Sequence, residues 1–155
     1  MKPIILSILT ASLVLLSGAC KSTENATFNS AKVYYVSNNG MNVLSLRSID
    51  FGKTKEEAIY NAEKLAFQNL FFRGIPRSPF QNPLLGINEQ EQYRKNRDYL
   101  DTFYKQRMQT FITYSYETIS KAKKGQKQAL VNITINMKAL RKDLEANNVI
   151  EKFGI

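Results

Sequence analysis

The chain has 155 residues, with 22 Lys and Arg against 13 Asp and Glu, which gives a formal net charge of +9. This length favours one domain, and 43% hydrophobic with 23% charged residues is ordinary for a folded globular protein. The absence of His and the single Cys exclude histidine-dependent catalysis, intrachain disulfides and thiolate metal clusters. We therefore expect a protein that is not an enzyme and uses no metal or other cofactor.

Residues 1–19 have the layout of a secretory signal peptide, with a positive start, an apolar run and small residues at the end. The run is shorter than the roughly 20 residues that a membrane-spanning helix needs. It leads into LSGAC, which ends at Cys20 and resembles a bacterial lipobox, although the usual Leu three residues before the Cys is Ser17 here. We expect Cys20 to carry acyl chains that anchor the protein to a membrane. The alternative is an ordinary signal peptide cut after Ala19.

Residues 20–31 are polar and predict a flexible tether between the lipid and a domain that spans residues 32–155. Lys21 follows the Cys, where Asp retains lipoproteins in the inner membrane of many Gram-negative bacteria. We therefore expect a location on the outer membrane, facing the periplasm. The basic balance of the chain favours anionic partners such as phospholipid headgroups, lipopolysaccharide or an acidic protein.

A β-hairpin is predicted from Lys32 to Phe51, because two strand-forming runs flank Asn39-Gly40, a type I′ turn signal. A helix is predicted from Lys55 to about Phe72, with Thr54 and Glu57 at capping-box spacing. Its alanines recur every fourth residue, which predicts a helix that lies close against a sheet.

The segment from Arg73 to Ile87 contains three of the four prolines and is too apolar for a flexible linker. We interpret it as an ordered loop, either laid over the domain or offered to a partner. Its candidate partner-binding residues are the apolar Ile75, Phe80, Leu84 and Leu85.

A second long helix is predicted from Glu89 to about Arg107, capped by Asn88. Its basic side chains are candidate anion-binding residues: Arg94, Arg97, Lys105 and Arg107.

Two strands and a helix are predicted in the last third of the chain, over Met108–Ser120, Ala129–Met137 and about 138–147. The second strand alternates apolar and polar residues, which is typical of a strand with one buried face. The order β-β-α-α-β-β-α predicts the α+β class, with an antiparallel sheet of about four strands and helices packed on one face.

The aromatic residues of the first of these strands, Phe111, Tyr114 and Tyr116, could stack on single-stranded nucleic acid. The sequence has no Gly-x-x-Gly loop, and export would remove the usual ligand. We expect these aromatics to be core residues or cross-strand pairs, and we expect no nucleic-acid partner.

Several segments resemble those of small bacterial lipoproteins. The Cys-containing leader, Phe51-Gly52 and the alanine stripe Ala58, Ala62 and Ala66 are similar to the LPP-twenty-like group and to the amino-terminal domains of flagellum-associated envelope proteins. Other segments, LFFRGIP at 70–76 and the ending KFGI at 152–155, are similar to uncharacterised lipoproteins of Bacteroides-type bacteria. The resemblance implies an envelope compartment and a helix packed on a sheet, and it implies no active residue.

The sequence thus favours a lipid-anchored envelope protein that acts as a non-catalytic interaction or assembly module, with an envelope protein as partner. The alternative is a binding protein for an anionic envelope ligand, namely lipopolysaccharide, peptidoglycan or anionic lipid.

Overall fold

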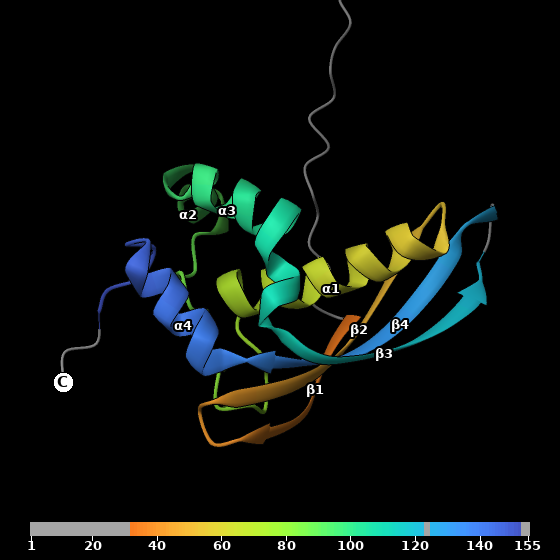
Figure 1. Cartoon of the computed structure of the whole chain (residues 1–155), viewed down its shortest axis with the longest axis horizontal. Coiled ribbons are helices and arrows are strands. Elements are labelled where there is room, and N and C mark those ends of the chain that lie inside the picture. The colour runs from red at the N-terminus through yellow and green to blue at the C-terminus, as the bar shows by residue number, and fades with distance from the viewer. Residues whose placement is uncertain (1–31, 123–124, 153–155) are drawn as a thin grey trace, which may run out of the picture.

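A four-stranded antiparallel sheet, with helices packed on one of its faces, makes up residues 32–122 and 125–152, the part of the chain that the computed structural model describes (Figure 1). The strands β1 (Val33–Asn39), β2 (Val43–Gly52), β3 (Ile112–Lys121) and β4 (Lys127–Asn136) lie in the order β1-β2-β4-β3. The α+β class predicted from the sequence is confirmed. The predicted signal peptide and Cys20 lie outside the described residues.

The helical elements follow β2 and β4 along the chain. They are α1 (Lys55–Phe72), α2 (Glu89–Lys95), α3 (Arg97–Thr102), the π-helical η2 (Phe103–Arg107), the 3-10 helix η3 (Met108–Phe111) and α4 (Met137–Ala146). All of them lie on the same side of the sheet, and α1 runs along its length (Figure 1). No helix of the described residues has the length and apolarity needed to span a membrane.

The start of α1 is fixed by a capping box, as predicted. The Thr54 hydroxyl oxygen accepts a hydrogen bond from the Glu57 backbone N–H at 3.1 Å. The Glu57 carboxylate reaches back and accepts from the Lys53 N–H at 2.6 Å. Backbone donors at the start of the helix are thereby paired, which sets where α1 begins.

The alanine stripe of α1 presses directly on the sheet. Ala58, Ala62 and Ala66 have no exposed surface. At the end of β2, a Cβ added to Gly52 would lie only 2.4 Å from the Ala58 nitrogen, so strand and helix meet without room for a side chain. The expectation of a helix held close to a sheet is confirmed, and the reason is small residues on both sides of the contact.

The proline-rich segment 73–87 folds back onto the core. Ile75, Phe80 and Leu85 are at most 7% exposed, and Leu84 is half-buried against the same cluster. These side chains help to seal the core, which leaves little of their surface for the partner that the sequence analysis expected them to bind. The sequence left two interpretations of this loop open, and the structure shows a loop that is laid over the domain.

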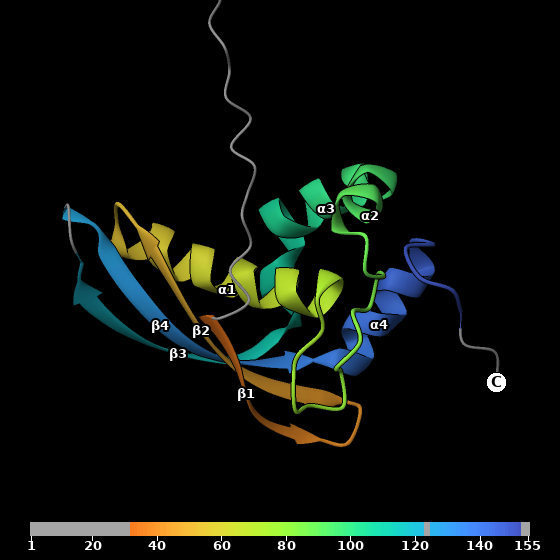
Figure 2. The same ribbon diagram turned by 180° about the vertical axis from the view of Figure 1, so that it is seen from behind.

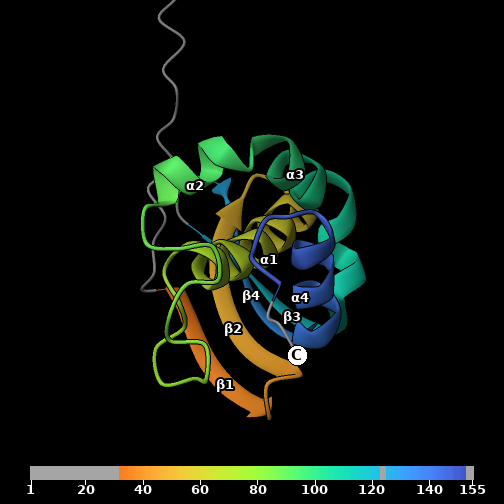
Figure 3. The same cartoon turned by 90° about the vertical axis from the view of Figure 1, so that its left-hand side faces the viewer.

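Two features hold this loop in place beside the β1–β2 hairpin (Figures 2 and 3). The Leu85 N–H donates to the Phe71 carbonyl at 2.9 Å, which pairs a carbonyl at the end of α1 that has no partner within the helix. Gly74 has φ of +76°, and a Cβ there would lie 1.8 Å from the Gln81 carbonyl oxygen. Only glycine fits at this turn.

The long second helix predicted over residues 89–107 is broken into α2, α3 and η2. At the break, the Asn96 side chain donates to the Gln92 carbonyl at 3.0 Å. The π-helical η2 turns both Phe103 and Tyr104 into the core, where the Phe103 ring lies 5.3 Å from that of Phe67. The helix therefore bends to pack its aromatic residues on α1, and the prediction of one continuous helix is wrong.

The strand predicted from Met108 begins four residues later, at Ile112. Met108 and Phe111 are both buried, at 2% and 6% exposure, and the turn of η3 brings them to the same side. An extended backbone would point these two residues to opposite faces of the strand.

Candidate interaction surface

One face of the sheet carries no helix in the described part of the chain, and we call it the open face (Figure 2). Strand register assigns residues to it, because paired residues of antiparallel strands lie on the same side of the sheet. Its central residues are Tyr34, Ser45, Arg47, Ile49, Tyr114, Tyr116, Thr118, Leu130, Asn132 and Thr134. None of them is fully buried.

One row of the open face crosses all four strands. Tyr34 pairs with Arg47, Arg47 with Asn132, and Asn132 with Tyr116. The Arg47 Nε donates to the Asn132 Oδ1 at 2.9 Å, which orients the guanidinium in the middle of the row. Tyr34 and Tyr116 stand at the two ends, and 50% and 57% of their respective surfaces are exposed. An oriented cation is thus flanked by two accessible aromatic rings.

A second row lies beside the first. The hydroxyl groups of Ser45 and Thr134 lie 3.0 Å apart across β2 and β4 and share a hydrogen bond. Tyr114 pairs with Thr134 and is 61% exposed. The central strands β2 and β4 therefore present small polar groups that are hydrogen-bonded to one another, while the edge strands β1 and β3 present tyrosine rings.

The open face combines exposed tyrosines with small polar residues and a single cation. Arg47 is its one charged residue within the four described strands, and no carboxylate lies on it. Tyr and Arg dominate binding hot spots, and Tyr, Ser and Asn are the residues that paratopes use for adaptable contacts. Exposed tyrosines on rigid strands also lose little conformational entropy on binding.

The sequence did not single out this surface. Phe111 is a core residue, and Tyr114 and Tyr116 pair across the strands with Thr134 and Asn132, as expected for the aromatics of this strand. Both tyrosines are exposed on the open face. Their spacing of two residues was the available signal, since it places both rings on one side of a strand. Which side faces solvent depends on where α1 packs.

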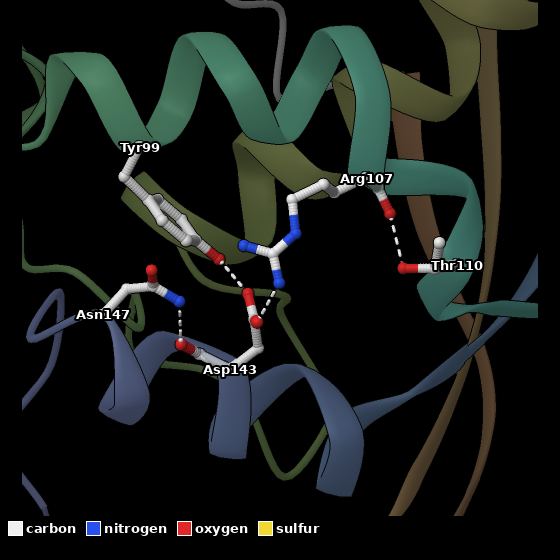
Figure 4. Close-up of polar contacts among 5 residues, drawn as sticks. All are labelled: Tyr99, Arg107, Thr110, Asp143 and Asn147. Atoms are coloured by element: carbon white, nitrogen blue, oxygen red, sulfur yellow. Dashed lines mark hydrogen bonds and ion pairs between the residues drawn. The ribbon is translucent and has the colours of Figure 1, made fainter.

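The predicted anion-binding residue Arg107 is engaged inside the protein (Figure 4). Its guanidinium forms an ion pair with Asp143 of α4, and the Tyr99 hydroxyl donates to the other carboxylate oxygen of Asp143 at 2.7 Å. Burial, followed by the hydrogen bond to Asp143, raises the pKa of Tyr99 and keeps the phenol protonated. These contacts join Tyr99 of α3 and Arg107 of η2 to α4, so Arg107 has a structural role in packing the helices together.

The other three predicted anion-binding residues lie on the surface. Arg97 is near Asp101, with its Nε 3.9 Å from a carboxylate oxygen. Arg94 and Lys105 are exposed and form no ion pair within the described residues. Two of the four cations therefore already face carboxylates, and two remain available.

A groove of about 770 Å³ lies between the proline-rich loop, α2, α4 and residues 149–151. Lys95 and Arg141 lie on its walls, and Met41 of the β1–β2 turn, which is 51% exposed, lies at its margin. Its volume is in the range of small-molecule sites. Gln92 and Lys95 of α2 both lie on its lining, so the groove borders the basic residues of that helix.

Glu63 of α1 is a carboxylate within the core, 4% exposed. It accepts hydrogen bonds from the Gln109 side chain and from the Ser115 hydroxyl, the latter at 3.4 Å. Burial raises the pKa of Glu63 despite these two donors. No group of three or more His, Cys, Asp or Glu side chains in the described residues is arranged to hold a metal ion.

Comparison of the chain with known proteins found no matching family model, no matching curated protein and no matching solved structure.

Proposed function

We propose that this protein is a lipid-anchored, non-catalytic interaction module of a bacterial cell envelope, which docks an envelope protein on its open face. The observation that carries the docking surface is the row Tyr34–Arg47–Asn132–Tyr116, where aromatic rings flank an oriented guanidinium on an uncovered sheet. Such Tyr and Arg side chains supply most of the binding energy in protein interfaces.

The anchor and the compartment rest on the sequence. The signal-peptide pattern, the lipobox-like LSGAC and the resemblance to small envelope lipoproteins support acylation of Cys20 and an outer-membrane location facing the periplasm. Mass spectrometry of the mature amino terminus tests this part. A diacylated Cys20 is expected, together with release of the Cys20→Ser variant from the membrane fraction. An unacylated Cys20 would overturn the anchor.

Site-specific photo-cross-linking in the bacterium tests the docking surface. A photo-reactive phenylalanine in place of Tyr116 is expected to link the protein to one envelope protein. The same residue in place of Lys142, which is exposed on α4 at the helix-covered side, is the matched control. Equal cross-linking from both positions, or none from Tyr116, would contradict docking on the open face.

Substitution then tests the tyrosines themselves. Changing Tyr34, Tyr114 and Tyr116 to Ser should weaken binding of the cross-linked partner at least about tenfold, because truncated hot-spot residues each cost 2 kcal/mol or more. Ile87→Ser removes a residue that is 90% exposed elsewhere on the surface and should leave binding unchanged.

A second candidate function is the binding of an anionic envelope ligand, and the groove lined by Lys95 and Arg141 favours it. Lipopolysaccharide, peptidoglycan fragments and anionic lipid vesicles are the probes. Binding should weaken steeply with salt and fall in the Lys95→Gln variant, whose side chain lines the groove. Salt-independent binding, or none, would rule this candidate out.

A further inference from the structure

The two edges of the sheet differ in how well they are protected against strand pairing. β1 is seven residues long, and its register shifts between Tyr35 and Ser37, which interrupts the ladder in mid-strand. β3 is ten residues long and keeps a regular register with β4 from Tyr114 to Lys121. Short strands and bulges are common devices that prevent an edge from pairing with another chain. β1 is the shorter of the two and has its bulge in mid-strand, whereas the single irregularity of β3 lies at its start.

The outer side of β3 is open, since no strand pairs with it among the described residues and it forms a margin of the sheet (Figure 1). Its sequence, ITYSYETISK, contains no proline. Glu117 faces the helix-covered side, where its carboxylate lies 3.4 Å from the Lys55 ammonium. Between Tyr114 and Ser120 an approaching strand would therefore meet no charge on the open face.

The end of β3 has an unbalanced positive charge. Lys121 pairs with Lys127 across the β3–β4 hairpin, and neither forms an ion pair within the described residues. A strand added to β3 would bring its terminal side chains next to the Lys121 ammonium group, with that of Lys127 one strand further away on β4. Carboxylates at that position would be attracted and further cations repelled.

We propose that β3 is a strand-addition site for an extended segment of a partner protein, with β-branched or aromatic residues beside Tyr114 and Tyr116 and a carboxylate at the Lys121 end. This inference rests on the proposed function and names how the partner binds. Main-chain hydrogen bonds to the free edge of β3 supply affinity, and the tyrosines select alternate side chains of the added strand. The net charge of +9 opposes close pairing of two copies of this chain, so the occupant is a different protein.

The direct test uses a synthetic peptide of the length of β3 that alternates Thr and Val and carries two Asp residues at one end. Its control is the same peptide with the backbone nitrogens of both edges methylated, so that neither edge can pair with β3. Amide hydrogen exchange is measured on the isotope-labelled protein with and without each peptide. The unmethylated peptide should slow hydrogen exchange of alternate backbone amides between Tyr114 and Lys121, and the methylated peptide should not. Unchanged exchange in β3, or equal slowing by both peptides, would overturn the proposal.

A pair of proline variants gives an independent test. Glu117 and Thr118 are neighbours, so the N–H of one points toward β4 and that of the other points outward. Proline at the residue whose N–H points toward β4 should destabilise the fold, because it removes a hydrogen bond of the sheet. Proline at the residue whose N–H points outward, called the outward proline, should leave the free energy of unfolding nearly unchanged. The outward variant should weaken capture of the envelope partner about tenfold or more, through lost main-chain hydrogen bonds. Unweakened capture by this folded variant would overturn strand addition.

The outcomes for the two proposals can be separated. If the outward proline leaves capture unchanged while the tyrosine substitutions abolish it, strand addition is wrong and docking on the open face stands. If neither set of substitutions changes capture, both are wrong. A concentration-dependent dimer in sedimentation that the outward proline dissolves would make a second copy the occupant, which also overturns the proposal.

Discussion

The two faces of the sheet are built from the same four strands, but they differ in almost every property. On the covered face, Leu44 and Leu46 of β2 and Val131 and Ile133 of β4 are at most 1% exposed beneath α1. One residue further along each strand, the open face carries polar groups and exposed tyrosines. Packing restricts which side chains fit on the covered face, because the neighbouring residues leave no space for larger ones. The open face has no such constraint, so its tyrosines are available for binding.

The largest expected loss of stability lies on the covered side, in the aromatic cluster around Phe103. Its ring lies 5.2 Å from that of Phe71 and 5.6 Å from that of Phe111. Phe103→Ala should reduce the free energy of unfolding by about 3–5 kcal/mol, because it leaves a cavity that surrounding rings cannot fill. Urea unfolding measures this. A loss below 1 kcal/mol would show that the helical layer does not depend on this ring.

An intermediate loss is expected where α1 touches the sheet. Ala62→Leu adds volume to a position with no exposed surface and should cost about 1–3 kcal/mol in the free energy of unfolding. Ala146→Leu, at the exposed end of α4, is the matched control and should change stability little. Equal effects of the two substitutions would contradict close packing of the alanine stripe.

The features predicted correctly from the sequence are those set by short-range patterns. The β1–β2 hairpin, the capping box at Thr54 and the alternation in β4 each depend on residues close together in the chain, although the hairpin turns through residues 40–42 and not through the predicted type I′ turn at Asn39-Gly40. The break at Asn96 and the π-helical η2 were missed because they depend on the packing of Phe103 against α1, across a large separation in sequence. Periodicity within the segment from 89 to 107 carries no information on that contact.

The candidate surface was missed for a related reason. The spacing of Tyr114 and Tyr116 predicts a common side of a strand for both rings, but no local pattern predicts the strand order β1-β2-β4-β3 that leaves β3 at an edge. The apolar loop looked available because Phe80 and its neighbours are surrounded by prolines. Its hydrogen bond to the end of α1, which directs those side chains inward, is a tertiary contact.

A smaller, pH-dependent effect is expected from Glu63 on the covered side. Because burial raises its pKa, the folded protein binds this proton more tightly than the unfolded chain does. Stability is therefore lost as pH rises from the pKa of the unfolded chain through that of the folded protein. Glu63→Gln should remove this loss, so the free energy of unfolding of the variant should improve relative to the wild type as the pH rises from about 3 to about 7.

The control for this prediction is Glu151→Gln, which changes an exposed carboxylate. Its free energy of unfolding should follow that of the wild type across the same pH range. A Glu63→Gln variant whose difference from the wild type does not change with pH would show that Glu63 has the same pKa in the folded protein as in the unfolded chain, and would contradict the stated direction of the pKa shift.

The smallest effect on stability is expected on the open face. Tyr116→Thr keeps a β-branched residue at an exposed strand position and loses only cross-strand contacts, so the free energy of unfolding should change by about 0.5 kcal/mol or less. The same substitution removes one of the two rings that flank Arg47, so partner binding should fall while the fold persists. Urea unfolding and partner capture on one preparation separate the two quantities. A loss of stability comparable to that of Phe103→Ala would place Tyr116 among the residues that hold the fold together, and the two faces would then no longer differ in kind.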